Sequence, residues 1–395
     1  MKLVVFLALF AAGCLDAPPE AVNDPEEAPL VLGSVADDDN LTLDGQHELV
    51  IAGIHRSGGA EQPVALVLFA SESGIEAAVA GGAAVELDFE PIDIAFTRRE
   101  DVTGLAVLLG PGGELVSIDQ DLVSEEIRPT TGGDAIDLAF DHIAALQTLP
   151  GSRLVLSQAG EVWITDQLLT DTTFSDLPAW KVKVGDAIEW LAGVDVAGTN
   201  TVAAVTVAGD IDSSVVTPGD PPMLDPDQVA DVVPAPLDPV VWRGSSHGFA
   251  YLVGVNRSVP DIFWHQTAVP DTGTTSGSVL EGRFDLIHDL LITTVSTTVP
   301  DLVVLGERGG ALFVELYDNP LFNDAFDIGT PATFEIPADL VPPVWMRAMD
   351  AVGGDSGANE IIVYDQVGRV VCVDRIAGSG LTSCGSADLA ALVAP

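Results

Sequence analysis

Short apolar segments recur along this chain in a fixed order, separated by Gly, Asp, Pro and Thr. In each unit a first strand, which often ends in Asp, precedes a strongly apolar second strand, a Gly-containing turn and an apolar third strand. The second strands are expected at residues 48–53, 104–110, 153–158, 202–209, 250–255, 301–307 and 360–365. The third strands are expected at 65–70, 114–119, 161–166, 211–216, 261–266, 311–316 and 369–374. Short apolar segments bounded by turn residues predict β-strands.

The spacing of these units predicts the architecture. From residue 30 they repeat at about 50 residues, and several strands per unit at this period are typical of a β-propeller. Neighbouring sheets of a propeller pack face to face, which explains why the strands are apolar on both faces. We therefore predict an all-β propeller of seven blades over residues 30–395. Tandem β-sandwiches are the alternative. No clear amphipathic helix is visible, and residues 388–392 are expected to form one short turn.

The N-terminus has the pattern of an export signal. Lys2 precedes the apolar run Leu3–Phe10, which is too short to span a bilayer, since spanning needs about 20 residues. Together with Ala11-Ala12-Gly13-Cys14, it resembles the lipobox of bacterial lipoproteins, although Ala11 stands where the family usually has Leu. The resemblance implies that residues 1–13 are a signal peptide and that Cys14 carries lipid. An ordinary secretory signal is the alternative.

The same resemblance bears on localisation. Leu15 follows Cys14 where Asp would signal inner-membrane retention, so the outer membrane of a bacterial cell envelope is favoured. Each buried methylene adds about 0.8 kcal/mol, so two or three acyl chains would hold the protein on the membrane. Residues 14–29 are rich in Pro and acids and lack periodic apolar positions. They are predicted to form a solvated tether.

Net charge limits the classes of partner that the protein can bind, and the cysteines predict a disulfide. With 60 acidic and 15 basic residues the net charge is -45, which argues against nucleic acid because phosphates are repelled. It favours a cation or a basic partner, unless it reflects a salty habitat or a lysine-poor genome. Once Cys14 is assigned to lipid, Cys372 and Cys384 remain. Their proximity in sequence predicts a local disulfide in an oxidising compartment.

Two acidic loops resemble a known repeat. Asp37-Asp38-Asp39-Asn40, followed by Asp44-Gly45, precedes one apolar strand, and Asp350 with Gly353-Gly354-Asp355 precedes another. They resemble the FG-GAP (VCBS-like) repeats of propellers, whose loops read D-x-D-x-D-G-x-x-D. The resemblance implies calcium bound by Asp37, Asp39 and Asp44. Neither loop keeps the full ligand spacing, so turn capping is the alternative.

Other acids are predicted at the ends of first strands. They are Asp141, Asp195, Asp289 and Asp350. If these strands line the central channel, the four carboxylates would form an acidic ring at one mouth.

Catalytic motifs are weak. Gly244-Ser245-Ser246-His247-Gly248 matches G-x-S-x-G, but the hydrolase motif needs a helix after it, and residues 249–255 have the pattern of a strand. The six histidines are scattered, and most tryptophans lie in predicted strands, where packing is favoured over carbohydrate stacking.

The sequence therefore predicts a lipid-anchored envelope protein that acts as a non-enzymatic binding or scaffold module for a protein or polymer partner, assisted by calcium. The alternative is an envelope hydrolase or lyase with its active site at the propeller mouth. A propeller supports either function, so the fold alone does not choose between them.

Overall fold

The structure is a computed structural model, and it describes most of the chain from residue 28 onward. The described residues are 28–39, 41, 46–99, 103–127, 130–131, 134–135, 139–146, 153–165, 173–174, 180–181, 187–196, 199–206, 211–217, 223–224, 230–233, 240–246, 251–256, 260–266, 275–278, 280, 282–293, 295, 301–318, 329–337, 339–351, 359–376 and 380–394. The predicted signal peptide and nearly all of the predicted tether, residues 1–27, lie outside them. Among the described residues, no helix is long and apolar enough to cross a bilayer.

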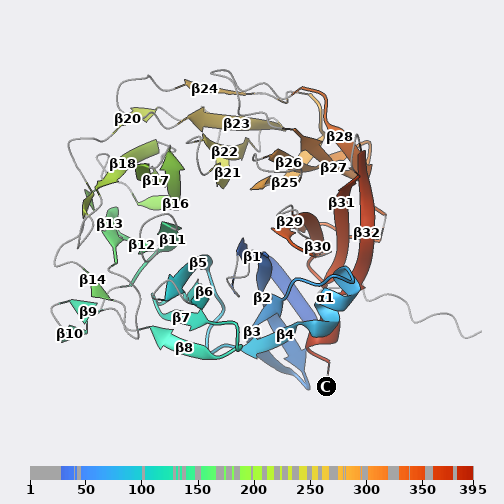
Figure 1. The fold of residues 1–395 in the computed structure, drawn as a ribbon, viewed down its shortest axis with the longest axis horizontal. Helices are drawn as coiled ribbons and strands as arrows, with labels where there is room; N and C mark the ends of the chain where they lie inside the picture. The colour runs from blue at the N-terminus through green and yellow to red at the C-terminus, as the bar shows by residue number, and fades with distance from the viewer. Residues whose placement is uncertain are drawn as a thin grey trace, which may run out of the picture.

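The strands of the described residues form eight sheets, of which seven are arranged as blades around a ring (Figure 1). Blade 1 contains β1 (Leu30–Asp39), β2 (Glu48–Ser57), β3 (Ala60–Leu68) and β4 (Ala83–Glu86). Blade 2 contains β5 (Asp93–Arg99), β6 (Thr103–Leu109), β7 (Leu115–Ile118) and β8 (Ser124–Ile127). Blade 3 contains β11 (His142–Leu146), β12 (Arg153–Gln158), β13 (Glu161–Ile164) and β15 (Trp180–Lys181).

The remaining blades follow the same order. Blade 4 contains β16 (Ile188–Val196), β17 (Thr199–Thr206), β18 (Ile211–Thr217), β19 (Met223–Leu224) and β20 (Ala230–Val233). Blade 5 contains β21 (Val240–Ser246), β22 (Tyr251–Asn256), β23 (Asp261–Gln266) and β24 (Thr275–Ser278). Blade 6 contains β25 (Leu286–Thr293), β26 (Asp301–Arg308), β27 (Ala311–Tyr317) and β28 (Ala332–Glu335). Blade 7 contains β29 (Val344–Met349), β30 (Glu360–Asp365), β31 (Arg369–Ile376) and β32 (Gly380–Asp388).

Three further elements lie outside this pattern. A small sheet joins β9 (Thr130–Thr131), β10 (Asp134–Ala135) and β14 (Thr173–Phe174). The helix α1 (Ile75–Gly81), which the sequence did not predict, packs against β32 at the outer edge between blades 1 and 7 (Figure 1). The short helix η2 (Leu389–Leu392) is the predicted turn, and the Asp388 side chain caps it by accepting the Ala390 N–H at 2.9 Å.

The order of strands confirms the prediction of a propeller. Within each blade consecutive strands are antiparallel, and the first strand lies nearest the axis. Adjacent first strands contact one another around the whole ring, from β1 through β5, β11, β16, β21, β25 and β29 back to β1. All the predicted second and third strands are strands of the structure.

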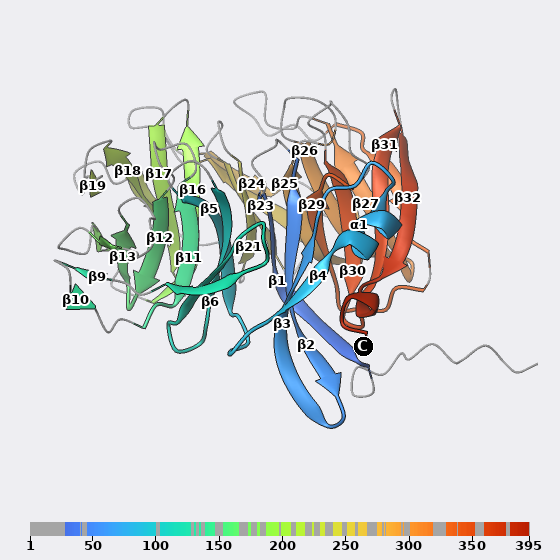
Figure 2. The same cartoon turned by 60° about the horizontal axis from the view of Figure 1, so that its bottom comes forward.

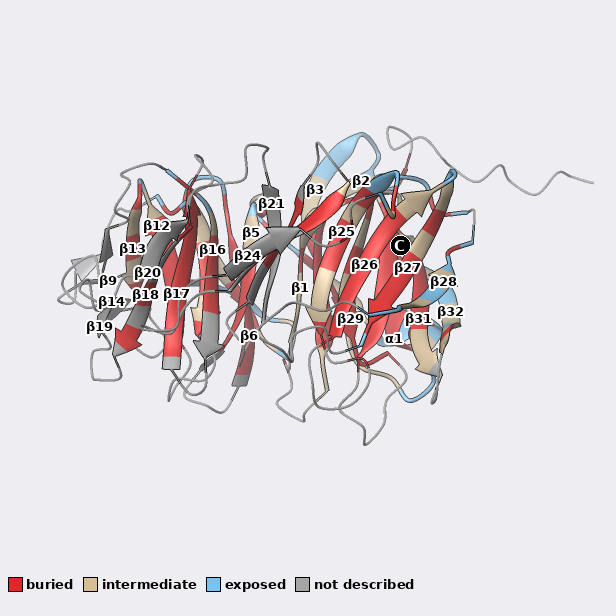
Figure 3. Cartoon of the chain, turned by 90° about the horizontal axis from the view of Figure 1, so that it is seen from above, coloured by how far each residue is buried: buried red, intermediate tan, exposed pale blue. Residues whose placement is uncertain are grey.

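The core lies between blades, because the second strands are buried on both faces. In β2, Leu49 and Ile51 belong to the apolar cluster between blades 1 and 7, whereas Val50 belongs to the cluster between blades 1 and 2. β26 shows the same alternation. Val303 and Leu305 belong to the cluster between blades 6 and 7, whereas Leu302 and Val304 belong to the cluster between blades 5 and 6. Buried segments of β2 and β26 are visible in Figure 3. Period-two alternation on a two-sided sheet therefore gives a continuous apolar run.

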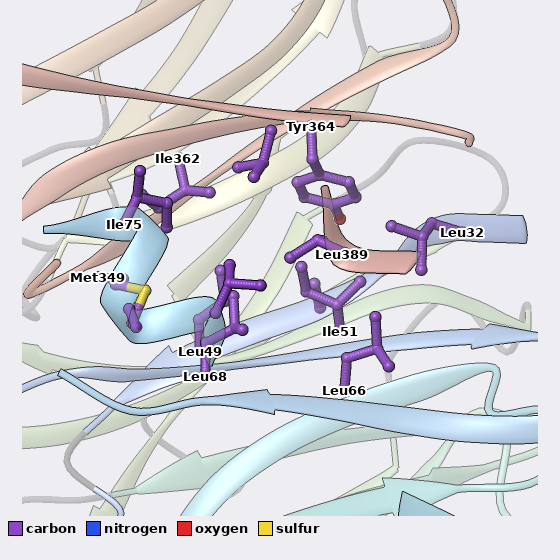
Figure 4. Close-up of a cluster of buried hydrophobic side chains, with 14 of the residues drawn as sticks. Leu32, Leu49, Ile51, Leu66, Leu68, Ile75, Met349, Ile362, Tyr364 and Leu389 are labelled. Carbon is purple, nitrogen blue, oxygen red and sulfur yellow. The ribbon is translucent and has the colours of Figure 1, made fainter. Parts of the chain in front are cut away.

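The first and last blades close the ring by packing, without sharing a sheet. Their cluster brings Leu32 of β1, Ile75 of α1, Tyr364 of β30 and Leu389 of η2 together, and Figure 4 shows these side chains converging between the elements. A disulfide joins Cys372 of β31 to Cys384 of β32, with 5.0 Å between the Cα atoms. This bond lies in the strand pair that α1 covers.

Candidate functional site

The ring has two distinct faces. We call the end where the first strands begin the entry face, and the end where they finish the exit face. On the entry face the β2–β3 hairpin projects beyond the other blades (Figures 2 and 3). The reason is length, since β2 has 10 residues whereas β26 has 8 and β30 has 6. Gly58 and Gly59 make its turn with φ of 60° and 85°, which glycine adopts without strain.

The projecting hairpin is polar at its tip. The Arg56 Nε lies 2.9 Å from the Glu61 Oε1, and both residues line a shallow hollow with Gly59 and Ala60. The Arg56 backbone N–H donates to the Pro29 carbonyl at 2.8 Å. Because Pro29 leads into β1, the chain enters the propeller beside the hairpin, on the entry face.

Two deeper hollows lie on the entry face, and the first of them borders β2. One, of about 360 Å³, lies at the seam of blades 7 and 1 and is lined by Leu32, Ile54, Pro343 and Trp345 among others. The other, of about 510 Å³, lies between blades 6 and 7 and includes Pro342 in its wall. Because Pro342 and Pro343 are adjacent, a single proline pair separates the two hollows.

Apolar side chains are exposed near these hollows. Among the described residues four large hydrophobic side chains are exposed, and three of them lie just before or at the start of a first strand: Ile92 (45%), Leu286 (43%) and Val341 (40%). They therefore lie on the entry face, whereas Val123 follows β7 and lies on the exit face. Exposed apolar side chains beside hollows are typical of an interaction surface.

The seam of blades 7 and 1 depends on Arg347. A bulge in β1 displaces residues 33–35 from the β2 ladder, and the Gly33 and Ser34 carbonyls accept hydrogen bonds from blade 7. The Arg347 guanidinium donates to the Ser34 and Ala36 carbonyls, both at 2.6 Å, and to the Asp289 Oδ2 at 3.0 Å. Asp289 is 1% exposed. Arg347 therefore joins three blades and neutralises a buried carboxylate. No sequence motif pointed to this residue.

Asp37, Asp38 and Asp39, predicted to lie in a calcium loop, are instead the last residues of β1 on the exit face, and Asp38 forms an ion pair there. The His47 Nδ1 lies 3.1 Å from the Asp38 Oδ2, and the Asn359 Nδ2 lies 3.3 Å from the same nitrogen. Asp37 Oδ1 accepts the Asp38 N–H, and burial, followed by the charges of Asp38 and Asp39, raises the pKa of Asp37. Asp44 lies outside the described residues. Within the described residues no cluster of three His, Cys, Asp or Glu side chains is arranged to hold a metal, and calcium binding stays a prediction.

The acids that begin second strands have a shared structural role. Glu48 Oε2 accepts the Leu41 N–H at 2.7 Å, Asp301 Oδ2 accepts the Val295 N–H at 3.2 Å, and Glu360 Oε2 accepts the Ala351 N–H at 2.6 Å. In each case a buried carboxylate caps the loop between the first and second strands. This bonding accounts for the acid at the end of the repeat motif.

His47 gives the exit face a pH dependence. Burial alone would lower its pKa, but the hydrogen bond to Asp38 and the charges of Asp38, Asp39 and Glu48 outweigh this and raise it to about 9. A raised pKa contributes stability below the unfolded value near 6.5, and this is lost as pH rises through 9. Because the side chain is 36% exposed, solvent screening limits the contribution to about 1 kcal/mol.

The free energy of unfolding of the unaltered protein should therefore include a loss of about 1 kcal/mol from His47 between pH 6 and pH 9.5. His47→Gln should lack this loss, so its free energy of unfolding should fall by about 1 kcal/mol less over the same range. Urea titrations of both proteins at the two pH values measure this. Identical pH dependence in the variant would contradict the ion pair.

The predicted acidic ring at one mouth is wrong. Asp141 precedes β11 on the entry face, where its Oδ2 accepts the Ala159 N–H at 2.9 Å. Asp289 lies inside β25, bound to the Met346 N–H and Arg347, and Asp350 follows β29 on the exit face. Asp195 lies within β16, and its side chain is outside the described part. The four Asp residues stand at different positions relative to their first strands: before the strand, within it or after it. Their carboxylates therefore do not lie together at one end of the channel.

The described part of the serine motif lacks the strand-turn-helix setting that exposes a nucleophilic serine. Gly244, Ser245 and Ser246 lie in β21, and the next element is β22 rather than a helix. His247 and Gly248 are outside the described residues. Trp163, Trp190, Trp242, Trp264 and Trp345 all lie in strands, as predicted. The Trp345 ring packs 5.6 Å from that of Tyr364.

Comparisons with known proteins bear on the fold. No family model matches the sequence, and no curated protein matches it. Among solved structures, BBS1N in complex with ARL6DN, soaked with lead, aligns with a TM-score of 0.56 at 13% identity, covering 92% of this chain and 98% of that one. The same complex soaked with mercury aligns with a TM-score of 0.54 at 13% identity, covering 91% of this chain and 97% of that one. The chain is a β-propeller. A fucose-specific lectin from Aleuria aurantia gives a TM-score of only 0.41 at 12% identity, covering 72% and 91%.

Proposed function

We propose that this propeller is a non-enzymatic binding module that presents its entry face to a protein partner, and that lipid on Cys14 holds it at the bacterial outer membrane. The observation that carries the proposal is the concentration of features on one face. The projecting hairpin, two hollows and three exposed apolar side chains all lie there. The similar BBS1N propeller is itself in complex with a protein, ARL6DN, which supports a protein partner.

The anchor fits this geometry. The chain enters β1 beside the hairpin, so a tether from Cys14 would begin at the entry face and place it toward the membrane. A partner would then be embedded in, or lie close to, the same membrane. The net charge of -45 supports attachment through lipid rather than through contact with anionic headgroups.

Photo-crosslinking in the cells that make the protein tests the binding face. A photoreactive amino acid at Ala60, on the exposed hairpin tip, should give one discrete cross-linked product. The same amino acid at Val123, equally exposed but on the exit face, should give none. Cross-links from Val123 alone would overturn the proposed face.

The anchor is tested in the same cells. Cys14→Ser should move the protein from the membrane fraction to the soluble fraction and weaken the Ala60 cross-link. Unchanged partitioning into detergent would contradict lipid attachment at Cys14.

A further inference from the structure

The hollow between blades 6 and 7 combines an apolar wall with two carboxylates. Leu312, Ile336 and Leu340 belong to the apolar cluster between these blades and also line the hollow. Glu307 and Glu335 line it as well, together with the exposed Pro337 and Pro342. Its volume of about 510 Å³ lies within the range of ligand sites.

The arginines of blade 6 do not neutralise these carboxylates. Arg283 and Arg308 both bind Glu315, each with an N–H to the Oε1 at 3.1 Å, and Tyr317 donates its hydroxyl to the same carboxylate. Glu315 faces blade 5, because its neighbour two positions on, Tyr317, belongs to the apolar cluster between blades 5 and 6. The two basic groups are therefore occupied on the opposite face of the sheet.

No described arginine or lysine pairs with Glu307 or Glu335. Within the described part of the chain Glu335 has no ion-pair partner, and the Glu307 Oε2 lies 3.7 Å from the Nε2 of His288. Burial lowers the pKa of His288, so the imidazole is neutral at pH 7 and does not balance the carboxylate.

His288 lies beside Glu307 but is not part of the wall of the hollow. Its side chain is only 9% exposed, and its Nε2 lies 3.7 Å from the Glu307 Oε2 without a hydrogen bond to any described residue. The ring therefore leaves the Glu307 carboxylate available to a cation in the hollow.

We propose that this hollow receives an arginine side chain of the protein partner. The inference rests on the proposed function and names the chemistry of the partner. A guanidinium carries five N–H donors, enough for both carboxylates. Its aliphatic stem would pack on Leu312, Ile336 and Leu340. The rigid Pro337 and Pro342 border a preformed wall, and the net charge of -45 attracts a basic segment.

The test uses the purified full-length protein with labelled Leu and Ile methyl groups. The probes are acetyl-Gly-Arg-Gly-amide and the same peptide with citrulline, which has the shape of arginine but no charge. The arginine peptide should shift the methyl signals of Leu312, Ile336 and Leu340, with at least tenfold tighter binding than the citrulline peptide. The double variant Glu307→Gln/Glu335→Gln should weaken binding of the arginine peptide at least tenfold.

Glu86→Gln is the matched control, because Glu86 is exposed at the end of β4 just as Glu335 is exposed at the end of β28. It should leave binding unchanged. Equal binding of the two peptides, shifts elsewhere in the protein, or an unaffected double variant would overturn the site. If Ala60 cross-links a partner while neither peptide binds, the proposed arginine site is wrong and the proposed binding face is supported. If the arginine peptide binds while only Val123 cross-links, the hollow binds arginine, but the proposed binding face is wrong and the arginine is not supplied by that partner.

Discussion

Replacing Arg347 with methionine is expected to lower the free energy of unfolding by about 3–5 kcal/mol. Methionine keeps much of the apolar stem but removes every donor of the guanidinium. Asp289, 1% exposed, would then remain buried without its cation, although it still accepts the Met346 N–H at 3.0 Å. The Ser34 and Ala36 carbonyls of the β1 bulge would lose their donors as well.

Urea unfolding at pH 7 measures this loss. Arg375→Met is the matched control, because Arg375 pairs with the largely exposed Asp318 and so should cost less than about 1 kcal/mol. A second variant, Arg347→Met/Asp289→Asn, removes the uncompensated charge and should recover part of the stability. Equal losses for the two arginine variants would show that Arg347 does not hold the ring closed.

Replacing both Cys372 and Cys384 with alanine is expected to cost about 3 kcal/mol. The bond closes a loop between residues 12 apart, and constraint of the unfolded chain predicts about this amount for such a loop. The position adds to its importance, because β32 carries the surface against which α1 packs. Without the disulfide, we expect β32 to become less rigid and to weaken the contacts between blades 1 and 7.

Reduction of the unaltered protein offers an independent measurement. Thermal unfolding with and without a thiol reductant should show a lower midpoint in the reduced sample, whereas the double alanine variant should not respond. Trypsin should also cleave the reduced form faster. A reductant effect that persists in the double variant would mean that this bond is not its origin.

Much of the fold was predictable from the sequence because each second strand is buried on both faces. A run such as residues 301–307 has no polar interruption, and seven such runs at a regular spacing fit a ring of packed sheets. The helix Ile75–Gly81 escaped prediction because it is short and buries Ile75, Ala78 and Val79 among small residues. A segment of that length gives too little periodic pattern to stand out.

The site was less predictable, because its parts come from distant segments. Arg347 contacts residues 34 and 36, more than 300 positions away, and a bulge in β1 presents the carbonyls it binds. The hollow between blades 6 and 7 likewise unites residues from β26, the end of β28 and the following loop. Asp37 and Asp39 stood out as acids of a predicted loop, but nothing in that pattern indicated that they end β1 or that His47 pairs with Asp38 between them. The length of the β2–β3 hairpin was visible only once the blades could be compared.

The closure of the ring has a consequence for how the molecule comes apart. At each of the other junctions between blades the polypeptide crosses from one sheet to the next, but between blades 7 and 1 no covalent chain does so. That junction relies on side chains and on a few backbone bonds, such as Leu32 N–H to the Gln366 carbonyl at 2.8 Å. A pull on the N-terminus therefore loads this junction first. The amide protons of Leu32 and Asp350, whose carbonyl acceptors lie across it, would exchange through opening of the ring rather than through global unfolding. If lipid on Cys14 anchors the protein as proposed, the junction between blades 7 and 1 is where a force on the anchor would first open the ring.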